Sequence, residues 1–442
     1  MDSVRLILPA IGFVIIAAYV RPWRQGAFAI WSFVAIAFAL VSAIATELLV
    51  VRTAVAATSG IFSLVGLLFS GGSAATNAVR CSIAFVAMAA ISAVIGSVPD
   101  ASILRWLGLF CMLLFALSLT TVKSLDFGLS RYVIQWQLYF CFVSAAVILF
   151  FFITRGSILG SRFSLSQSIP ATGTASIACH AAIACGCTAA FAQTNWKRRL
   201  FWSGWLVMVL AVLASGSRGA LVSIIVVSPF MLFPKQFERQ VHYRSFLMVL
   251  CTMGIVAWAY VSLHALSLAG ESTLGIFLRL DREDVLSTRR SLWEGAITRG
   301  WERPIFGHGI GASSYYWAEN IEETDLSGGS TVHSQFVEIF FDEGLVGIIL
   351  FAGILAFSVF AALRWIEFAA SHRSRYALFL CLSWLAVAIE LIGHGGKTTP
   401  GNSSAVLFWI NTFLISIRPD RVFTMLDGDE AMFVEELERE GA

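Results

Sequence analysis

Residues 332–347 have the sequence VHSQFVEIFFDEGLVG, in which a short polar head leads into a predicted helix. The 71 residues before that helix, 265–335, form a polar island in an otherwise apolar chain. The island holds ten of the chain's 28 acidic residues, six of its 30 basic residues and two of its seven histidines. Because loops on a rigid scaffold commonly carry function, we expect the chemistry at this loop's face of the membrane.

The rest of the chain has the composition of a membrane protein. Of its 442 residues, 58% are hydrophobic and 13% are charged, and the mean hydropathy is +0.79; soluble domains are less apolar. A helix needs about 20 apolar residues to cross the hydrocarbon core. We therefore predict an all-α, polytopic integral membrane protein with 12 or 13 transmembrane helices. The predicted apolar runs are 4–20, 27–50, 54–70, 81–98, 103–122, 132–153, 172–192, 200–214, 217–234, 246–264, 336–363, 376–395 and 403–418.

The positions of Lys and Arg predict the orientation, because short basic loops face the cytoplasm. Counting spans places four basic clusters on one side, and the island on the opposite, outer side. The topology divides the chain into an N-terminal transmembrane bundle of about ten spans (1–264), a large periplasmic loop (265–335), C-terminal transmembrane helices (336–418) and an acidic cytoplasmic tail (419–442). The clusters are Lys197-Arg198-Arg199, then Lys235 with Arg239 and Arg244, then Arg364 with Arg373 and Arg375, and lastly Arg418 with Arg421.

Cysteine usage and charge exclude several other classes. All eight cysteines lie in or beside apolar runs, so we expect no disulfide framework. Cys179-His180 and Cys185-Gly186-Cys187 have spacings that resemble metal ligands, but they stand among Ala and Ile without a nearby carboxylate. We predict close helix packing there and no metal. The chain has no basic tract for binding nucleic acid.

Inside the island we predict one helix and one glycine-rich turn. Ser287 is a suitable N-cap for a helix that runs from residue 288 to about Gly300, and Pro304 follows soon after its end. The turn, residues 307–311, is expected to be flexible and to lead into a lid. The aromatic side chains that this lid would offer to sugar rings are those of Tyr315, Tyr316 and Trp317.

Three arginines are candidates for binding an anionic substrate. Arg218 stands at the mouth of an apolar span between small residues, where a guanidinium can hold a phosphate with two hydrogen bonds. It could instead extend toward phospholipid headgroups. Arg289 shares a helix face with Trp293, and Arg290 shares one with Glu294, because residues four apart are neighbours. Both arginines could also belong to a solvated face.

The helix that begins after the island carries the remaining candidates. His333 at its start could be a general base near neutral pH, or a satisfied polar cap. Ser334 is four residues before Glu338, so these two can meet. Acids inside a span are functional candidates, and Gly344 with Gly347 would form a small-residue edge for helix contact. The acids noted on this basis are Glu338, Asp342 and Glu343, with Glu390 four residues from His394 on the penultimate predicted span.

With these residues the chain resembles the O-antigen ligase and Wzy-type polymerase superfamily of bacterial envelope glycan enzymes. Ser217-Arg218-Gly219 is similar to the family's Ser-Arg-Gly element. Residues 289–311 resemble its Arg-x-x-x-Trp and Pro-x-x-Gly-x-Gly region, and residues 333–347 resemble its His-Asn-x-x-Leu…Gly-Leu-x-Gly signature. Ser334 stands where the family most often has Asn.

The resemblance implies a GT-C-like fold in the bacterial inner membrane and a metal-independent, inverting glycosyltransferase without a cofactor. Its donor would be a glycan on undecaprenyl diphosphate at the periplasmic face. Arg218 and Arg289 would bind the diphosphate, and His333 would activate the acceptor hydroxyl. Arg290, Trp293, Ser334, Tyr315 and Tyr316 complete the predicted substrate-binding set.

Four functions remain open at this point, and one of them is a non-catalytic scaffold for an envelope assembly, with the acidic tail at residues 427–440 as its contact. A polymerase of exopolysaccharide or O-antigen would use a saccharide acceptor, and a ligase would use lipid A-core. A transporter or flippase of lipid-linked saccharide is the alternative from another class, although no repeated half is visible. The expected partners are these substrates, membrane lipids and other envelope polysaccharide assembly proteins.

Overall fold

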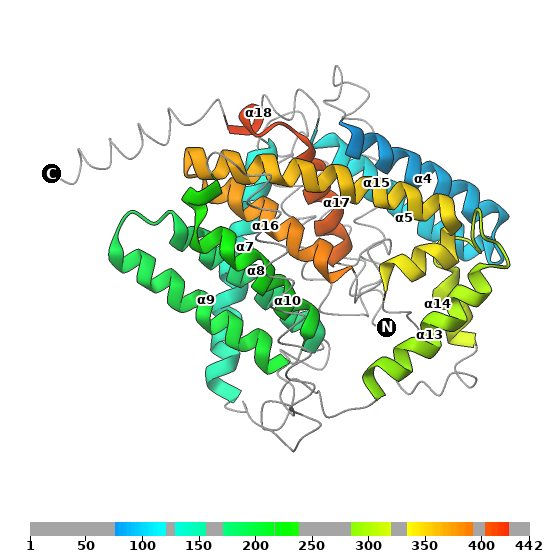
Figure 1. Ribbon diagram of the computed structural model, residues 1–442, viewed down its shortest axis with the longest axis horizontal. Helices are drawn as coiled ribbons and strands as arrows, with labels where there is room; N and C mark the ends of the chain where they lie inside the picture. Colours follow the sequence, from blue (N-terminus) through cyan, green and yellow to red (C-terminus); the bar gives the residue numbers. More distant parts are fainter. Residues whose placement is uncertain are drawn as a thin grey trace, which may run out of the picture.

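A computed structural model of the chain describes residues 76–120, 129–155, 171–215, 217–237, 284–319, 334–391 and 403–423. Within these ranges the secondary structure is helical, and no strand occurs there (Figure 1). The elements are α4 (Asn77–Ile95), α5 (Pro99–Ser118), α7 (Leu129–Arg155), α8 (Ala171–Ala190), α9 (Asn195–Ser215), α10 (Arg218–Leu232), the 3₁₀ helix η3 (Pro234–Phe237), α13 (Asp284–Gly300), α14 (Ala312–Glu319), α15 (Gln335–His372), α16 (Arg375–Glu390), α17 (Ser403–Ser416) and α18 (Pro419–Phe423).

The all-α, membrane-spanning fold class is confirmed. Six described helices are long and apolar enough to cross a bilayer: α4, α5, α8, α9, α15 and the central part of α7. Gly219–Leu232 in α10 and Leu407–Ser416 in α17 are shorter apolar helices. The predicted spans 4–20, 27–50, 54–70 and 246–264 lie outside the described residues, so the total of 12 or 13 stays a prediction.

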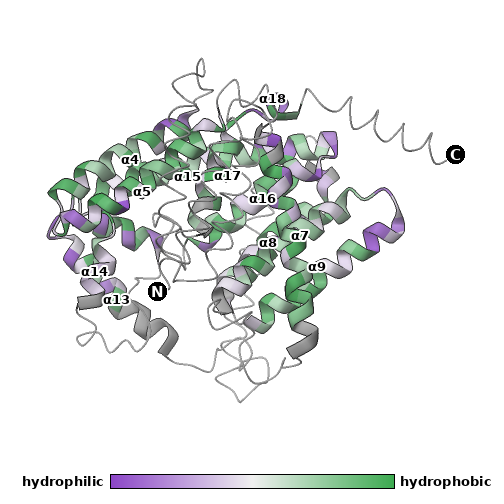
Figure 2. Cartoon of the chain, turned by 180° about the vertical axis from the view of Figure 1, so that it is seen from behind, coloured by the Kyte–Doolittle hydropathy of each residue, from purple (hydrophilic) through white to green (hydrophobic). Residues whose placement is uncertain are grey.

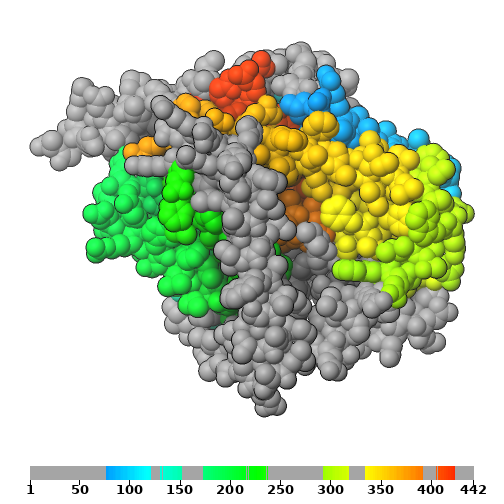
Figure 3. Space-filling model, in the orientation of Figure 1, coloured from blue at the N-terminus to red at the C-terminus, as the bar shows by residue number. Residues whose placement is uncertain are grey.

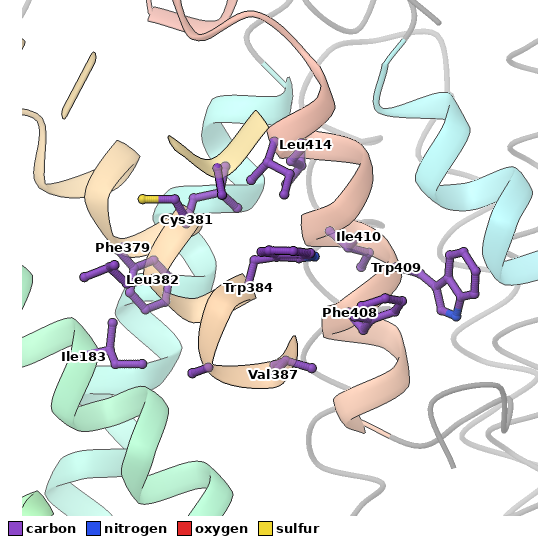
Figure 4. Packing of buried hydrophobic residues seen from close by; sticks show 14 of the residues in the cluster. Ile183, Phe379, Cys381, Leu382, Trp384, Val387, Phe408, Trp409, Ile410 and Leu414 are labelled. Atoms are coloured by element: carbon purple, nitrogen blue, oxygen red, sulfur yellow. The ribbon is translucent and has the colours of Figure 1, made fainter. Parts of the chain in front are cut away.

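The helices pack around a large apolar core. Helices that are apolar on most of their faces are expected inside such a bundle. α8 and α9 form a hairpin, α4 packs along α15, and α16 packs against α8, α10 and α17. Figure 4 shows Trp384 of α16 reaching toward α17, where its indole N–H donates to Thr412 Oγ1 over 2.9 Å. Burying this ring therefore leaves its polar atom satisfied.

Two of the predicted basic clusters lie at one end of the bundle, as the topology requires. The indole N–H of Trp365, near the end of α15, donates to the carbonyls of Ile415 and Ile417. Phe368 stacks on Phe423 with ring centroids 5.8 Å apart. The residues around Arg373 and those around Arg418 are therefore neighbours. Figure 2 shows hydrophilic residues gathered near helix ends, with hydrophobic residues along α4, α5 and α9.

Small residues of α8 allow close helix contact, as the cysteine-rich segment predicts. A side chain at Gly186 would run into the Met231 side chain of α10, and would come within 3.2 Å of Trp205 Cδ1 on α9. One at Gly204 would meet Cys185 Sγ at 3.2 Å. The packing interpretation of this segment is confirmed.

The helix of the island begins earlier than predicted. α13 starts at Asp284, so Ser287 lies inside the helix and the predicted N-cap is wrong. The predicted end at Gly300 is confirmed.

The decisive feature of α15 is a kink at Gly344. This residue has φ 68° and ψ −163°, so the helix consists of a nine-residue arm, residues 335–343, and a long span from Leu345 to His372. We call residues 335–343 the arm. Gly344 is therefore a bend and not part of a small-residue edge for helix contact. Gly347 lies against Glu343 and Ile339 of the arm, so its contact is within α15 itself.

Replacing Gly344 by Ala is expected to destabilise the protein. Its backbone conformation is essentially restricted to glycine and costs other residues on the order of 1–3 kcal/mol, and the added Cβ would collide with the Ile305 carbonyl. We expect a lower Tm for the purified protein in detergent. Gly353→Ala in the same helix is the matched control, because its Cβ would meet only Cys81 Sγ at 3.4 Å. Equal Tm values for the two variants would contradict this account of the kink.

Candidate functional site

The kink in α15 is stabilised by a segment of the island that replaces the lost helical hydrogen bonds. A break at Gly344 removes the helical bonds from the amides of Leu345 and Val346 to the carbonyls of Phe341 and Asp342. Residues 303–311, which we call the wedge, supply new partners for all four groups. The wedge bonds are Leu345 N to Pro304 O (2.8 Å), Val346 N to Ile305 O (3.4 Å), His308 N to Phe341 O (2.9 Å) and Gly309 N to Asp342 O (2.8 Å). Bend and wedge therefore depend on each other.

The Asp342 side chain extends this connection to α14. Its Oδ2 accepts from Gly311 N at 2.7 Å and its Oδ1 accepts from Ser313 N at 2.8 Å. These amides lie at the start of α14, where backbone N–H groups have no partner within their own helix. Asp342 is buried. In this structure the carboxylate serves as a helix cap contributed by a different helix.

The glycines of the wedge allow close approach, which excludes a flexible lid. Gly307 and Gly309 have φ of 71° and 111°. A side chain at Gly307 would run into the Asp342 backbone, and one at Gly309 would meet Ser102 Oγ at 2.7 Å. Residues 307–311 are all buried. The prediction of a flexible turn here is wrong because the turn fills the space beside the kink.

α4, α5 and the connection between them hold the wedge, the arm and α14 from the other side. Ser97 N donates to His308 O over 2.7 Å, and Ser92 Oγ donates to Asp342 O over 2.8 Å. Arg105 Nη1 donates to Ser314 Oγ over 3.2 Å. The sequence interpretation missed Arg105. Its position inside the predicted span 103–122 could have identified it, because charged residues inside a span are functional candidates.

The aromatic residues of the island have different roles. Tyr316 packs on Phe341 of the arm (ring centroids 5.7 Å apart) and lies edge-on to Trp317. The guanidinium of Arg299 lies 5.1 Å from the Tyr316 ring centroid. Tyr315 is exposed. Of the two tyrosines predicted to bind sugar, only Tyr315 thus has a largely open ring.

α13 lies against the arm (Figure 3). Its buried residues Leu292 and Ala296 form a cluster with Phe341, onto which Trp293 and Val337 also pack. A side chain at Gly300 would meet the Phe340 ring at 2.7 Å. By helical spacing, position 289 continues the face of 292, 293 and 296, whereas position 290 continues the face of the exposed Glu294. The side chains of Arg289 and Arg290 are not among those that the structure describes.

The arm begins beside the end of α16. Gln335 N donates to Leu391 O over 3.1 Å, and Glu338 N donates to Ser334 O over 3.0 Å. Ser334 and Glu338 are both buried, and the Ser334 hydroxyl forms no cap bond with α15. His333 precedes Ser334 and lies outside the described residues.

The start of α10 faces the same end of α16. Ser223 Oγ donates to Ala386 O over 3.1 Å, five residues after Arg218 and four before Glu390. Arg218 is the first residue of α10, and its side chain is not described. Ser176 of α8 donates to Glu390 Oε2 over 3.2 Å, and Glu390 is buried. Ser176 carries no signal in the sequence that would have identified it, and His394 lies outside the described residues.

The three segments that the motifs single out, in α10, α13 and α15, are thus connected through described contacts. The beginnings of α10 and α15 both contact the last turns of α16, and α13 packs on the arm of α15. No group of three or more His, Cys, Asp or Glu side chains with metal-site geometry occurs among the described residues.

Comparison with known proteins agrees with the motifs. Residues 203–352 match the family model described as O-antigen ligase, a segment that runs from α9 into the first part of the long span of α15. This match supports the resemblance to the O-antigen ligase and Wzy superfamily. The chain is also 27% identical over 240 residues to an uncharacterised protein of Haemophilus influenzae. That alignment covers 51% of this chain and 58% of the relative, so the chain spans little more than half of the relative's length.

Asp342→Ala is expected to destabilise the protein more than Asp342→Asn. Alanine leaves the buried amides of Gly311 and Ser313 without acceptors, at about 1–3 kcal/mol for each group, while the amide oxygen of Asn can still accept one bond. The measurement is Tm of the purified variants. Ser313→Ala is the matched control, because Ser313 donates through its backbone and keeps that bond. A Tm loss in Ser313→Ala as large as that in Asp342→Ala would refute the capping role.

Proposed function

We propose that this chain, a multi-pass membrane protein with an O-antigen ligase domain at residues 203–352, transfers a glycan from undecaprenyl diphosphate to an acceptor hydroxyl. The reaction takes place at the periplasmic face of the bacterial inner membrane and belongs to exopolysaccharide or O-antigen polymerisation. Transfer of the glycan to lipid A-core by a ligase is the alternative.

One observation carries the proposal. Elements that contain Arg218 and Ser334, more than 100 residues apart, both contact the last turns of α16, through Ser223 to Ala386 and through Gln335 to Leu391. His333, the residue proposed as the base, directly precedes Ser334 in the sequence. Helix N-termini also favour anions, and α10 and α15 both begin here.

Each proposed residue has a defined role in the transfer. Arg218 and Arg289 bind the donor diphosphate, and their charge stabilises it as it leaves. His333 takes the proton from the acceptor hydroxyl as its oxygen attacks the anomeric carbon. The bond from that carbon to the diphosphate oxygen breaks, undecaprenyl diphosphate departs, and the configuration inverts. No metal is assigned a role.

The secondary contacts have proposed roles of their own. Trp293 and Ser334 line the approach to the arm, and Tyr315 offers an exposed ring for stacking on a sugar. Arg290 remains a candidate for binding substrate, although position 290 lies on the same helix face as the exposed Glu294. Tyr316 stays in the proposed substrate-binding set, and its half-buried ring also packs on Phe341 and lies near the guanidinium of Arg299.

Arg289→Ala and His333→Ala are expected to abolish surface polysaccharide while the amount of inserted protein stays unchanged. Removing an electrostatic donor typically slows a reaction by about 10²–10³, and removing a general base by about 10²–10⁴. The readouts are polysaccharide by gel and protein by immunoblot of membranes. Arg299→Ala is the cation control on α13, because its ion pair with Glu302 (3.5 Å) is solvent-exposed. Full polysaccharide production by the Arg289 and His333 variants would exclude the mechanism.

Glycan analysis of a deletion strain is expected to distinguish polymerase from ligase. Loss of a polymerase leaves acceptor lipid capped with a single repeat, because chain extension stops. Loss of a ligase leaves full-length chains on the undecaprenyl carrier. The measurement is mass spectrometry of extracted lipid-linked glycans. We expect single repeats, and stranded full-length chains would establish the ligase instead.

A further inference from the structure

A band of exposed apolar side chains continues from the membrane-spanning helices onto the island. After α13, Trp301 is 59% exposed, Ile305 56% and Phe306 38%. At the adjoining helix ends, Ile95 of α4 and Leu345 of α15 are likewise exposed. Large apolar side chains of a soluble loop are seldom grouped in this way.

Hydrogen bonds fix this segment at the level where α4 ends and the long span of α15 begins. Leu345 N donates to Pro304 O over 2.8 Å, and Arg303 Nη1 donates to Ile95 O over 2.8 Å. The 20 residues between Glu343 and Arg364 carry no charge, and about 20 residues are needed to cross the hydrocarbon core. Leu345 therefore stands at the boundary of that core, and Ile305 stands beside it.

The backbone here is compatible with a layer that contains little water. Irregular backbone at membrane depth requires that its polar groups find partners within the protein. The carbonyls of Arg303, Pro304 and Ile305 accept from the amides of Gly307, Leu345 and Val346. The island thus includes a stretch with three exposed large apolar side chains, in which the carbonyls of residues 303–305 have hydrogen-bond partners within the protein.

We propose that residues 301–306 lie in the lipid leaflet on the side of α13 and α14, with Trp301, Ile305 and Phe306 in contact with phospholipid. The indole of Trp301 suits the boundary between headgroups and acyl chains. Glu302 and Arg303 extend their charged ends toward the headgroups. The surface is continuous with the lipid-facing sides of α4 and α15, and this continuity identifies phospholipid as its partner.

The test measures the depth of single labels in the full-length protein, reconstituted in vesicles of phosphatidylethanolamine and phosphatidylglycerol. Ile305→Cys and Phe306→Cys each carry an environment-sensitive fluorophore, and labelling of the unsubstituted chain gives the background from its eight cysteines. We expect blue-shifted emission that is lost with lipids bearing a nitroxide on the acyl chain and is little affected by iodide in the buffer.

Glu294→Cys, at an exposed polar position of α13, is the matched control and is expected to show the opposite pattern. Quenching by iodide at 305 and 306 equal to that at 294, with no loss from the nitroxide lipid, would overturn the proposal. Because the labels are read at two sites, a variant that fails to insert leaves the other to decide. The outcome does not depend on the glycosyl transfer proposed above.

Discussion

The exchange of hydrogen bonds at Gly344 is the constraint on which the packing of α13 and α14 against α15 depends. Bending α15 breaks two bonds of its own ladder, and the wedge restores a partner to each of the four groups. Leaving such groups buried and unpaired would cost about 1–3 kcal/mol each. The bend and the wedge therefore form together, and through Asp342 and Gly300 they fix α14 and α13 on the arm.

The spans were predictable because their signal is local. Apolar runs predicted nine of the described helices, and the small residues of α8 predicted close packing. The ends agree within five residues except in α15, which continues nine residues further, to His372. The kink was not predictable in the same way. Residues 336–363 form a continuous apolar pattern apart from their acids, so nothing in the periodicity marks Gly344 as a bend. Its conformation is imposed by the wedge, which lies more than 30 residues earlier in the chain.

The motif residues were identified individually, but some of their roles came only from three-dimensional contacts. Asp342 was noted as an acid inside a span, where function is the default expectation; its two amide partners reveal a cap. Tyr316 was predicted to bind a sugar, and the structure adds contacts of its ring with Phe341 and with the guanidinium of Arg299. The neighbours of Glu390 illustrate the same limit, since Ser176 lies 214 residues away in the sequence. Spacing rules cannot predict such distant pairs.

The anchoring of the wedge has a consequence for how this chain can vary in length. The connection from α13 to the long span of α15 is held at two places. Residues 303–311 bond to the kink, and the start of the arm bonds to the end of α16. Residues 312–334 therefore form a separate ring whose two ends are held by α15. Loop closure becomes only about 0.6 kcal/mol less favourable for each doubling of length. Insertions between Glu319 and Ser334 would thus be tolerated without displacing α13.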